Sequence, residues 1–226
     1  MIRSPHPKIR YRVLESVSEL GFPAGCPITG HPDGPKIVGP PWHAPHMTEH
    51  TIPTTFGPRL SGERSDPAPL GDERQALTES LEYYRRTFEL KCTGLDPGQL
   101  SERSVPPSTL TLHGLLRHLT GCERWWFRIQ FAGEAVPNLY YSDDDPDQDF
   151  TALDGDVGEA FSLWHNECER SREIVAASPL ERTGTRISTG EPFTLRWLML
   201  RMIGEYARHI GQADLIRERI DGATGE

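Results

Sequence analysis

The chain has 226 residues, a formal net charge of -9 and 36% hydrophobic residues, which is enough for one domain with a sizeable core and further segments outside it. The acidic balance argues against general binding to nucleic acids or anionic membranes, because both need a basic protein surface. No apolar run reaches the roughly eighteen residues of a membrane helix, and no apolar segment typical of a secretory signal is present near the N-terminus. Four widely spaced cysteines without a CxxC pair favour reduced thiols. We therefore expect a cytoplasmic protein.

Residues 1–70 contain thirteen of the 20 prolines. This spacing leaves little room for helices or strands, so we expect a flexible Pro/Gly-rich extension in which only Ile9 to Leu20 could be locally ordered. Met47 offers an alternative start of translation, which would leave out residues 1–46.

Four later segments are expected to be helices, because apolar residues recur in each at alternating steps of four and three, the pattern of a helix with one buried face. They run from about Asp72 to Cys92, Thr109 to Phe131, Val157 to Ala177 and Leu195 to Ile220. Thr194 and Gly222 are expected to cap the last helix at its two ends. No strand pattern is evident. The sequence therefore predicts an all-α four-helix bundle over residues 71–222, with connections long enough for a crossover topology.

Three polar residues fall where the helical pattern requires core residues. His118 lies on the second helix, and Glu205 and His209 lie on the fourth. The spacing of four lets Glu205 and His209 reach one point. Two histidines and one carboxylate match a catalytic zinc site whose fourth position is left to water or substrate. Buried histidine and glutamate side chains that only hydrogen-bond each other fit the same spacing, so both interpretations stay open at this point.

Cys122 lies four residues after His118 and could supply a fourth ligand, which would close the site and indicate a structural metal. We favour packing as a small hydrophobic residue, the common state of a buried cysteine. Trp125 and Trp126 could line an apolar pocket, although core packing is the simpler interpretation. The acidic run 143–147 lacks the spacing of a calcium loop and is interpreted as a solvated loop.

Two short motifs carry a resemblance to a known family. The segment 115–119 (LLRHL) and the segment 205–214 (EYARHIGQAD) resemble the DinB-like superfamily, and most closely its actinobacterial mini-circle-type branch, some members of which are described as mycothiol transferases. The resemblance covers about residues 70–222. It implies a four-helix bundle that holds a divalent metal, usually zinc or nickel, through His118, Glu205 and His209. Many members have histidine in all three places, and the carboxylate of Glu205 should favour zinc here.

The resemblance also implies an activity. A thiol that binds the metal would be held as a thiolate, which attacks an electrophilic carbon to give an S-conjugate. Gln212 could take a catalytic role by orienting the metal-bound species, or it could form a hydrogen bond near the helix end. The chain has 3 lysines against 21 arginines, which fits a GC-rich actinobacterial genome and points to mycothiol as the thiol.

Three functions are therefore considered: a zinc-dependent mycothiol S-transferase, a non-catalytic metal-binding stress or structural protein, and a maleylpyruvate isomerase. The isomerase is disfavoured, because that family has an additional C-terminal domain and this sequence ends shortly after the fourth helix. The expected partners of the transferase are the small thiol and an electrophilic small molecule, with no nucleic acid and no membrane. Bundles of this kind often pair, so a homodimer is left open.

Overall fold

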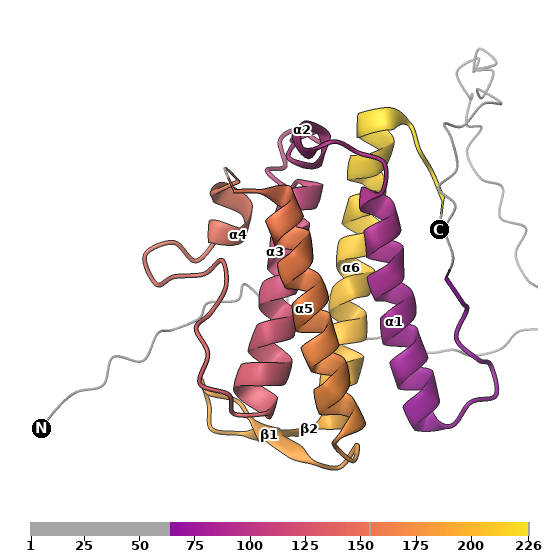
Figure 1. Ribbon diagram of the computed structural model, residues 1–226, viewed down its shortest axis with the longest axis vertical. Helices are drawn as coiled ribbons and strands as arrows, with labels where there is room; N and C mark the ends of the chain where they lie inside the picture. Colours follow the sequence, from indigo (N-terminus) through magenta and orange to yellow (C-terminus); the bar gives the residue numbers. More distant parts are fainter. Residues whose placement is uncertain (1–63, 154, 226) are drawn as a thin grey trace, which may run out of the picture. The chain divides into compact units, whose positions relative to one another are not determined.

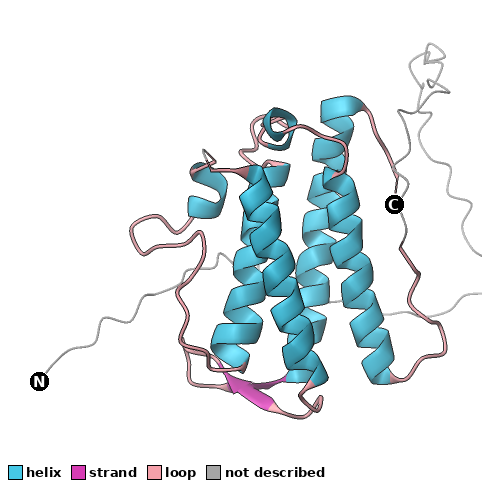
Figure 2. Ribbon diagram, viewed as in Figure 1, coloured by secondary structure: helices cyan, strands magenta, loops and turns pink. Residues whose placement is uncertain are grey.

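The computed structural model describes residues 64–153 and 155–225. This part of the chain is mainly helical (Figure 2). Its elements are α1 (Glu73–Cys92), α2 (Pro97–Leu100), α3 (Leu112–Glu123), the π-helix η1 (Arg124–Phe131), α4 (Gln148–Thr151), α5 (Val157–Ala176), β1 (Thr183–Thr185), β2 (Pro192–Thr194) and α6 (Leu195–Asp221). Ile9 to Leu20, Met47 and most of the predicted extension lie outside the described residues.

The predicted four-helix bundle is confirmed, and α1, α3 with η1, α5 and α6 form it (Figure 1). Helices α1 and α6 run in one direction, while α3, η1 and α5 run in the other (Figure 1). Helix α1 packs against α6, and α3 packs against both α5 and α6. The long connection 132–156, which includes α4, returns along the bundle and makes α3 and α5 parallel (Figure 1). The expected crossover is therefore present.

Local sequence signals set the ends of the helices. The side chain of Asp72 accepts a hydrogen bond from the backbone N–H of Gln75 at the start of α1, and Thr194 does the same for Trp197 at the start of α6. Gly222 ends α6 with a φ of 73°, a left-handed conformation that glycine adopts without steric cost. Both predicted caps of the last helix are confirmed.

The second predicted helix differs from expectation in its last two turns. Residues 124–131 form a π-helix, in which each N–H bonds five residues back instead of four. The backbone N–H of Ala132 accordingly donates to the carbonyl of Phe127. The apolar spacing of this segment is compatible with either kind of helix, so the sequence pattern alone could not distinguish them.

A small antiparallel hairpin precedes α6, where the sequence showed no strand pattern. Gly184 pairs with Phe193 at the centre of the hairpin, and Phe193 packs against Trp126 and Phe131. A Cβ on Gly184 would lie 2.7 Å from the Cα of Phe131, so this close approach requires glycine. Strands of three residues are too short for alternation to be recognised.

A buried polar network crosses the middle of the apolar core. Arg85 of α1 donates from Nε and Nη2 to the two carboxylate oxygens of Glu123 in α3, at 2.8 and 2.7 Å. The hydroxyl of Tyr206 in α6 donates to Glu123 Oε1 at 2.9 Å, and Trp164 Nε1 in α5 donates to the Tyr206 oxygen at 2.9 Å. Burial raises the pKa of Tyr206 well above its ordinary value. The network therefore joins all four long helices.

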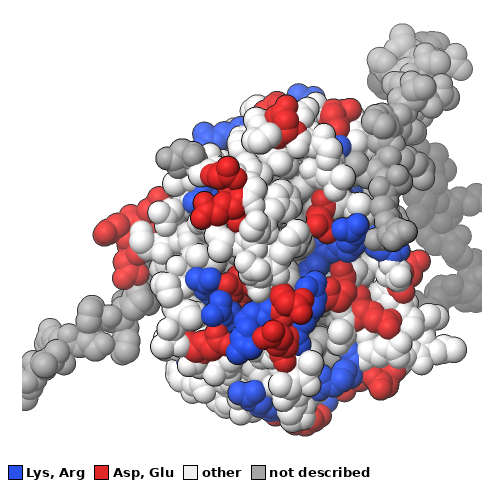
Figure 3. Space-filling view, viewed as in Figure 1, with Lys and Arg blue, Asp and Glu red and all other residues white. Residues whose placement is uncertain are grey.

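The surface carries charges of both signs. On the face shown in Figure 3, Lys and Arg lie among Asp and Glu. Many of the surface arginines form ion pairs, such as Arg170 with Glu134 and Arg172 with Glu82. None of the helices in the described part of the chain is both long and apolar enough to cross a membrane.

Candidate metal centre

Helices α3 and α6 bring together the three residues singled out by the sequence. Nε2 of His118 lies 3.3 Å from Oε1 of Glu205, and Nε2 of His209 lies 3.2 Å from the same oxygen. The two imidazole rings lie edge to face, with centroids 4.7 Å apart and planes inclined by 69°. The spacing of four within α6 and the packing of α6 against α3 account for this convergence.

The Nδ1 atom of each imidazole ring, on the side away from Glu205, forms a hydrogen bond with a further side chain. Nδ1 of His118 lies 2.7 Å from Oδ2 of Asp149, and Nδ1 of His209 lies 2.7 Å from Oε1 of Gln212. With a metal ion bound at Nε2, an acceptor at Nδ1 would keep the ring proton on Nδ1 and so fix the tautomer that binds metal. Metal-binding histidines are typically oriented by such outer partners. Gln212 thus contacts His209, which precedes it by about one turn in α6.

Asp149 is a residue of this centre that the sequence did not indicate. It lies in α4, and Arg117 holds that helix against α3 by donating to the carbonyls of Gln148 and Ala152. Phe150 stacks on the His118 ring at 5.3 Å between centroids. Oδ1 of Asp149 is buried without a hydrogen-bond partner. No pattern in the acidic run before it distinguishes this carboxylate from its solvated neighbours, because its position depends on the folding of a loop.

Cys122 adds a fourth donor atom. Its sulfur lies 3.5 Å from Nε2 of His118. One donor atom from each of His118, Cys122 and Glu205 lies within 4.8 Å of the others, so this group could hold a metal ion. Cys122 is buried, as the sequence suggested, but its sulfur faces the polar cluster as well as the core.

The donor separations fit the size of a divalent metal. Zinc bonds of about 2.1 Å to nitrogen and oxygen and 2.3 Å to sulfur, at tetrahedral angles, separate nitrogen from oxygen by about 3.4 Å and nitrogen from sulfur by about 3.6 Å. The observed separations are 3.2 and 3.3 Å between nitrogen and oxygen and 3.5 Å between nitrogen and sulfur. The donor types, imidazole, carboxylate and thiol, are those that zinc prefers.

The electrostatics of the cluster favour a bound cation. Hydrogen bonds from His118 and His209 hold the pKa of Glu205 far below its usual range. Burial alone would lower the pKa of His118, but Cys122 and the hydrogen bonds with Asp149 and Glu205 raise it well above its ordinary value. The same acidic groups would favour a divalent cation placed among them.

The two other histidines of the described residues contact side chains outside this cluster. His165 has a side chain that is 54% exposed and contacts Glu89, and His113 contacts Ser101. Trp126 packs against Phe193 and Trp197 at the hairpin end of the bundle. The pattern-based assignment of Trp126 to the core is therefore confirmed.

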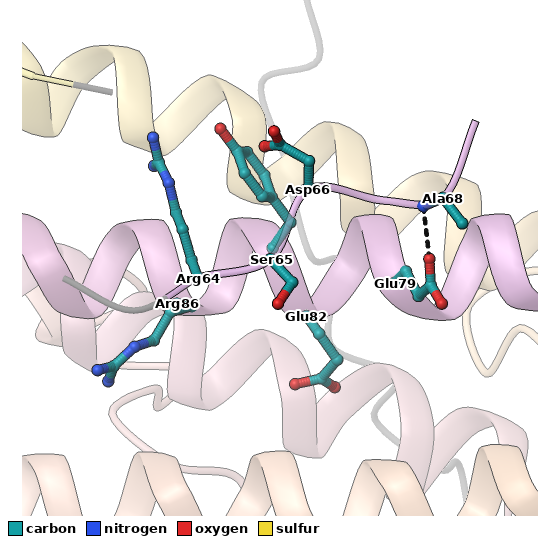
Figure 4. A pocket seen from close by; sticks show the side chains of 8 residues that line it. Arg64, Ser65, Asp66, Ala68, Glu79, Glu82 and Arg86 are labelled. Atoms are coloured by element: carbon teal, nitrogen blue, oxygen red, sulfur yellow. Dashed lines mark hydrogen bonds between the residues drawn. The ribbon is translucent and has the colours of Figure 1, made fainter.

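A separate pocket of about 430 Å³ lies between residues 64–68 and helix α1 (Figure 4). The backbone N–H of Ala68 donates to Glu79 beside it, at 2.7 Å. Its other lining residues are Arg64, Ser65, Asp66, Glu82, Tyr83 and Arg86. The pocket contains none of the metal-ligating side chains described above, so the chemistry of the site points to the cluster between α3 and α6.

A family model described as mycothiol-S-transferase matches residues 76–222, a range that begins within α1 and includes every donor of the cluster. No curated protein matches the chain. A mycothiol-dependent family implies a low-molecular-weight thiol as a partner. The chain therefore belongs to the mycothiol S-transferase family.

Proposed function

We propose that this protein is a zinc-dependent transferase that conjugates mycothiol to an electrophilic small molecule, with the metal held by His118, Glu205 and His209. The observation that carries the proposal is the convergence of both histidine Nε2 atoms on one oxygen of Glu205. The Nδ1 atoms of the two rings are hydrogen-bonded to Asp149 and Gln212. The family match supports the thiol and the transfer. A cytoplasmic location remains a prediction.

Each residue of the centre has a role in this proposal. A zinc ion held by His118, Glu205 and His209 would lower the pKa of a bound thiol, and it would thereby supply a nucleophilic thiolate near neutral pH. Asp149 and Gln212 keep the histidine rings oriented. The oxygen of Gln212 contacts His209, which leaves its amide N–H groups available to orient a bound species. The transfer forms a carbon–sulfur bond, the leaving group of the electrophile departs with the electrons of the bond that breaks, and the thiol proton is released to solvent.

The second candidate function is a metal-binding protein without catalysis, and the position of Cys122 favours it. A sulfur 3.5 Å from His118 Nε2 could complete four protein ligands. Structural zinc sites are closed in this way, whereas catalytic sites keep one position for water or substrate. The two functions therefore differ in whether a thiol from solution can reach the metal.

The proposed activity is tested with the full chain, zinc, mycothiol and monobromobimane, by following formation of the fluorescent conjugate. We expect a conjugation rate well above that of zinc and thiol alone, and loss of that excess when His209 is replaced by alanine. An equal rate with native protein and with His209→Ala would exclude catalysis at this centre and leave the non-catalytic function.

Replacement of Asp149 by alanine is expected to weaken zinc binding by about 10–100-fold, because the outer partner of His118 is lost. Competition with a chromophoric zinc chelator measures this change. Asp144→Ala is the matched control, because Asp144 lies in the same acidic segment but is exposed. Equal zinc affinities of the two variants would show that Asp149 does not support the site.

A further inference from the structure

The metal centre continues into a second cluster of side chains along the same two helices. In α6, Trp197, Arg201 and Glu205 follow each other at steps of four, which places them on one face. On the neighbouring helix, Trp126 follows Cys122 by four. Arg201 and Trp126 are therefore each about one turn from a donor of the candidate metal centre, toward the hairpin end of the bundle.

The side chains of this second cluster contact one another. The guanidinium carbon of Arg201 lies 4.6 Å from the centre of the Trp126 ring and 5.9 Å from that of Trp197. The two indole rings lie 5.6 Å apart. Arg186, from the hairpin, lies over Trp197 at 4.7 Å. Two guanidinium groups thus share one aromatic surface beside the metal donors.

Neither guanidinium group has a carboxylate partner among the described residues. Nε of Arg201 is buried without any hydrogen-bond partner. The buried arginines of the described residues all have hydrogen-bond acceptors for their terminal nitrogens: Arg85 binds Glu123, Arg217 binds Asp221, and Arg117 donates to two backbone carbonyls. In a chain of net charge -9, an unpaired, partly buried arginine beside a candidate reactive centre indicates a missing anion. The planar fork of a guanidinium group matches a carboxylate.

We propose that Arg201, assisted by Arg186 and the two indole rings, binds the carboxylate of the electrophilic substrate. The inference rests on the proposed transferase function, in which the thiol enters at the metal centre and the second reactant must lie beside it. Arg201 and Glu205 are about 6 Å apart along the helix axis, and we infer a similar separation between the carboxylate and the reacting carbon of the substrate. The substrate class is therefore a small carboxylic acid with an electrophilic carbon about one benzene ring away from the acid group.

A matched pair of electrophiles tests this specificity. The thiol of mycothiol displaces bromide from 4-(bromomethyl)benzoate or from the corresponding neutral methyl ester; a carbon–sulfur bond forms, bromide leaves with the bonding electrons, and the thiol proton goes to solvent. We expect Arg201→Gln to lower kcat/KM for the acid by about tenfold or more while that for the ester stays unchanged. Arg201→Lys should restore part of the preference. Arg208→Gln is the control, since Arg208 is an exposed arginine of the same helix.

A binding measurement keeps this inference separate from the activity. Because Trp126 and Trp197 contact Arg201, 4-methylbenzoate should change the tryptophan fluorescence of the full chain, and 4-methylbenzamide should not. The change should be lost in Arg201→Gln and kept in Arg208→Gln. If no electrophile is conjugated but this binding persists, the transferase function fails and the carboxylate site stands. Equal loss of activity toward acid and ester, or a response to inorganic phosphate but not to the benzoate, would overturn the carboxylate site.

Discussion

Replacement of Glu123 by alanine is expected to lower the free energy of unfolding by about 3–5 kcal/mol, because it removes the buried carboxylate that pairs with Arg85 and leaves that arginine only the partly exposed Glu82. Glu123 is fully buried, and Arg85 is 3% exposed. Both nitrogens that Arg85 directs at Glu123 would lose their acceptor, and so would the hydroxyl of Tyr206. Urea denaturation followed by far-UV circular dichroism measures the change.

Glu169→Ala is the control for this prediction, because Glu169 pairs with Arg172 on the surface and is 65% exposed. Exposed pairs of this kind contribute about 0–1 kcal/mol. Similar losses of stability in Glu123→Ala and Glu169→Ala would contradict a structural role for the buried network. Because Glu123 follows Cys122 and Tyr206 follows Glu205, the network also supports the backbone on both sides of the candidate metal centre.

If Cys122 completes the metal coordination, as the second candidate function requires, its replacement by serine removes the strong near-ultraviolet sulfur-to-metal absorption of the cobalt-substituted protein. The physical reason is that the Cys122 sulfur lies 3.5 Å from His118 Nε2, within reach of a metal held by the same donors. Cobalt(II) titration of the full chain, monitored by absorption, measures it. Cys92→Ser is the control, because burial in α1 raises the pKa of Cys92 to about 12 and its sulfur is remote in sequence from the donors.

Addition of mycothiol to the cobalt protein then distinguishes the two candidate functions. In a transferase, the thiol enters the metal coordination, so a sulfur-to-metal band should appear in Cys122→Ser when mycothiol is added. An absorption spectrum of Cys122→Ser that does not respond to mycothiol would favour the closed, structural site. Absence of any sulfur band in the native cobalt protein would mean that Cys122 only packs against the cluster.

Most of the bundle could be predicted from the sequence, because the regular spacing of apolar residues identifies long amphipathic helices. Within this apolar spacing, Glu205 and His209 were recognisable in α6 as polar residues at core positions. His118 was recognisable in α3 for the same reason. Their convergence needed only the spacing of four and the packing of two helices. Thr194 and Gly222 were recognisable because capping depends on local backbone chemistry.

The remaining features depend on contacts distant in sequence. Asp149 reaches His118 only because Arg117 holds α4 against α3. The hairpin has strands of three residues, whose stability comes from packing of Phe193 against Trp126 and not from a strand pattern. The contact between Cys122 and His118 depends on side-chain direction. Such details follow from tertiary packing, which overrides local propensity.

Zinc content decides whether the donors between α3 and α6 form a metal site. The full chain and the double variant His118→Ala/His209→Ala are purified with added zinc, dialysed and measured by inductively coupled plasma mass spectrometry. We expect about one zinc ion per native chain and none above background in the double variant, with both proteins folded by circular dichroism. Native protein that retains no zinc would instead identify His118, Glu205 and His209 as a buried hydrogen-bonded group, and the proposed transferase chemistry would be rejected.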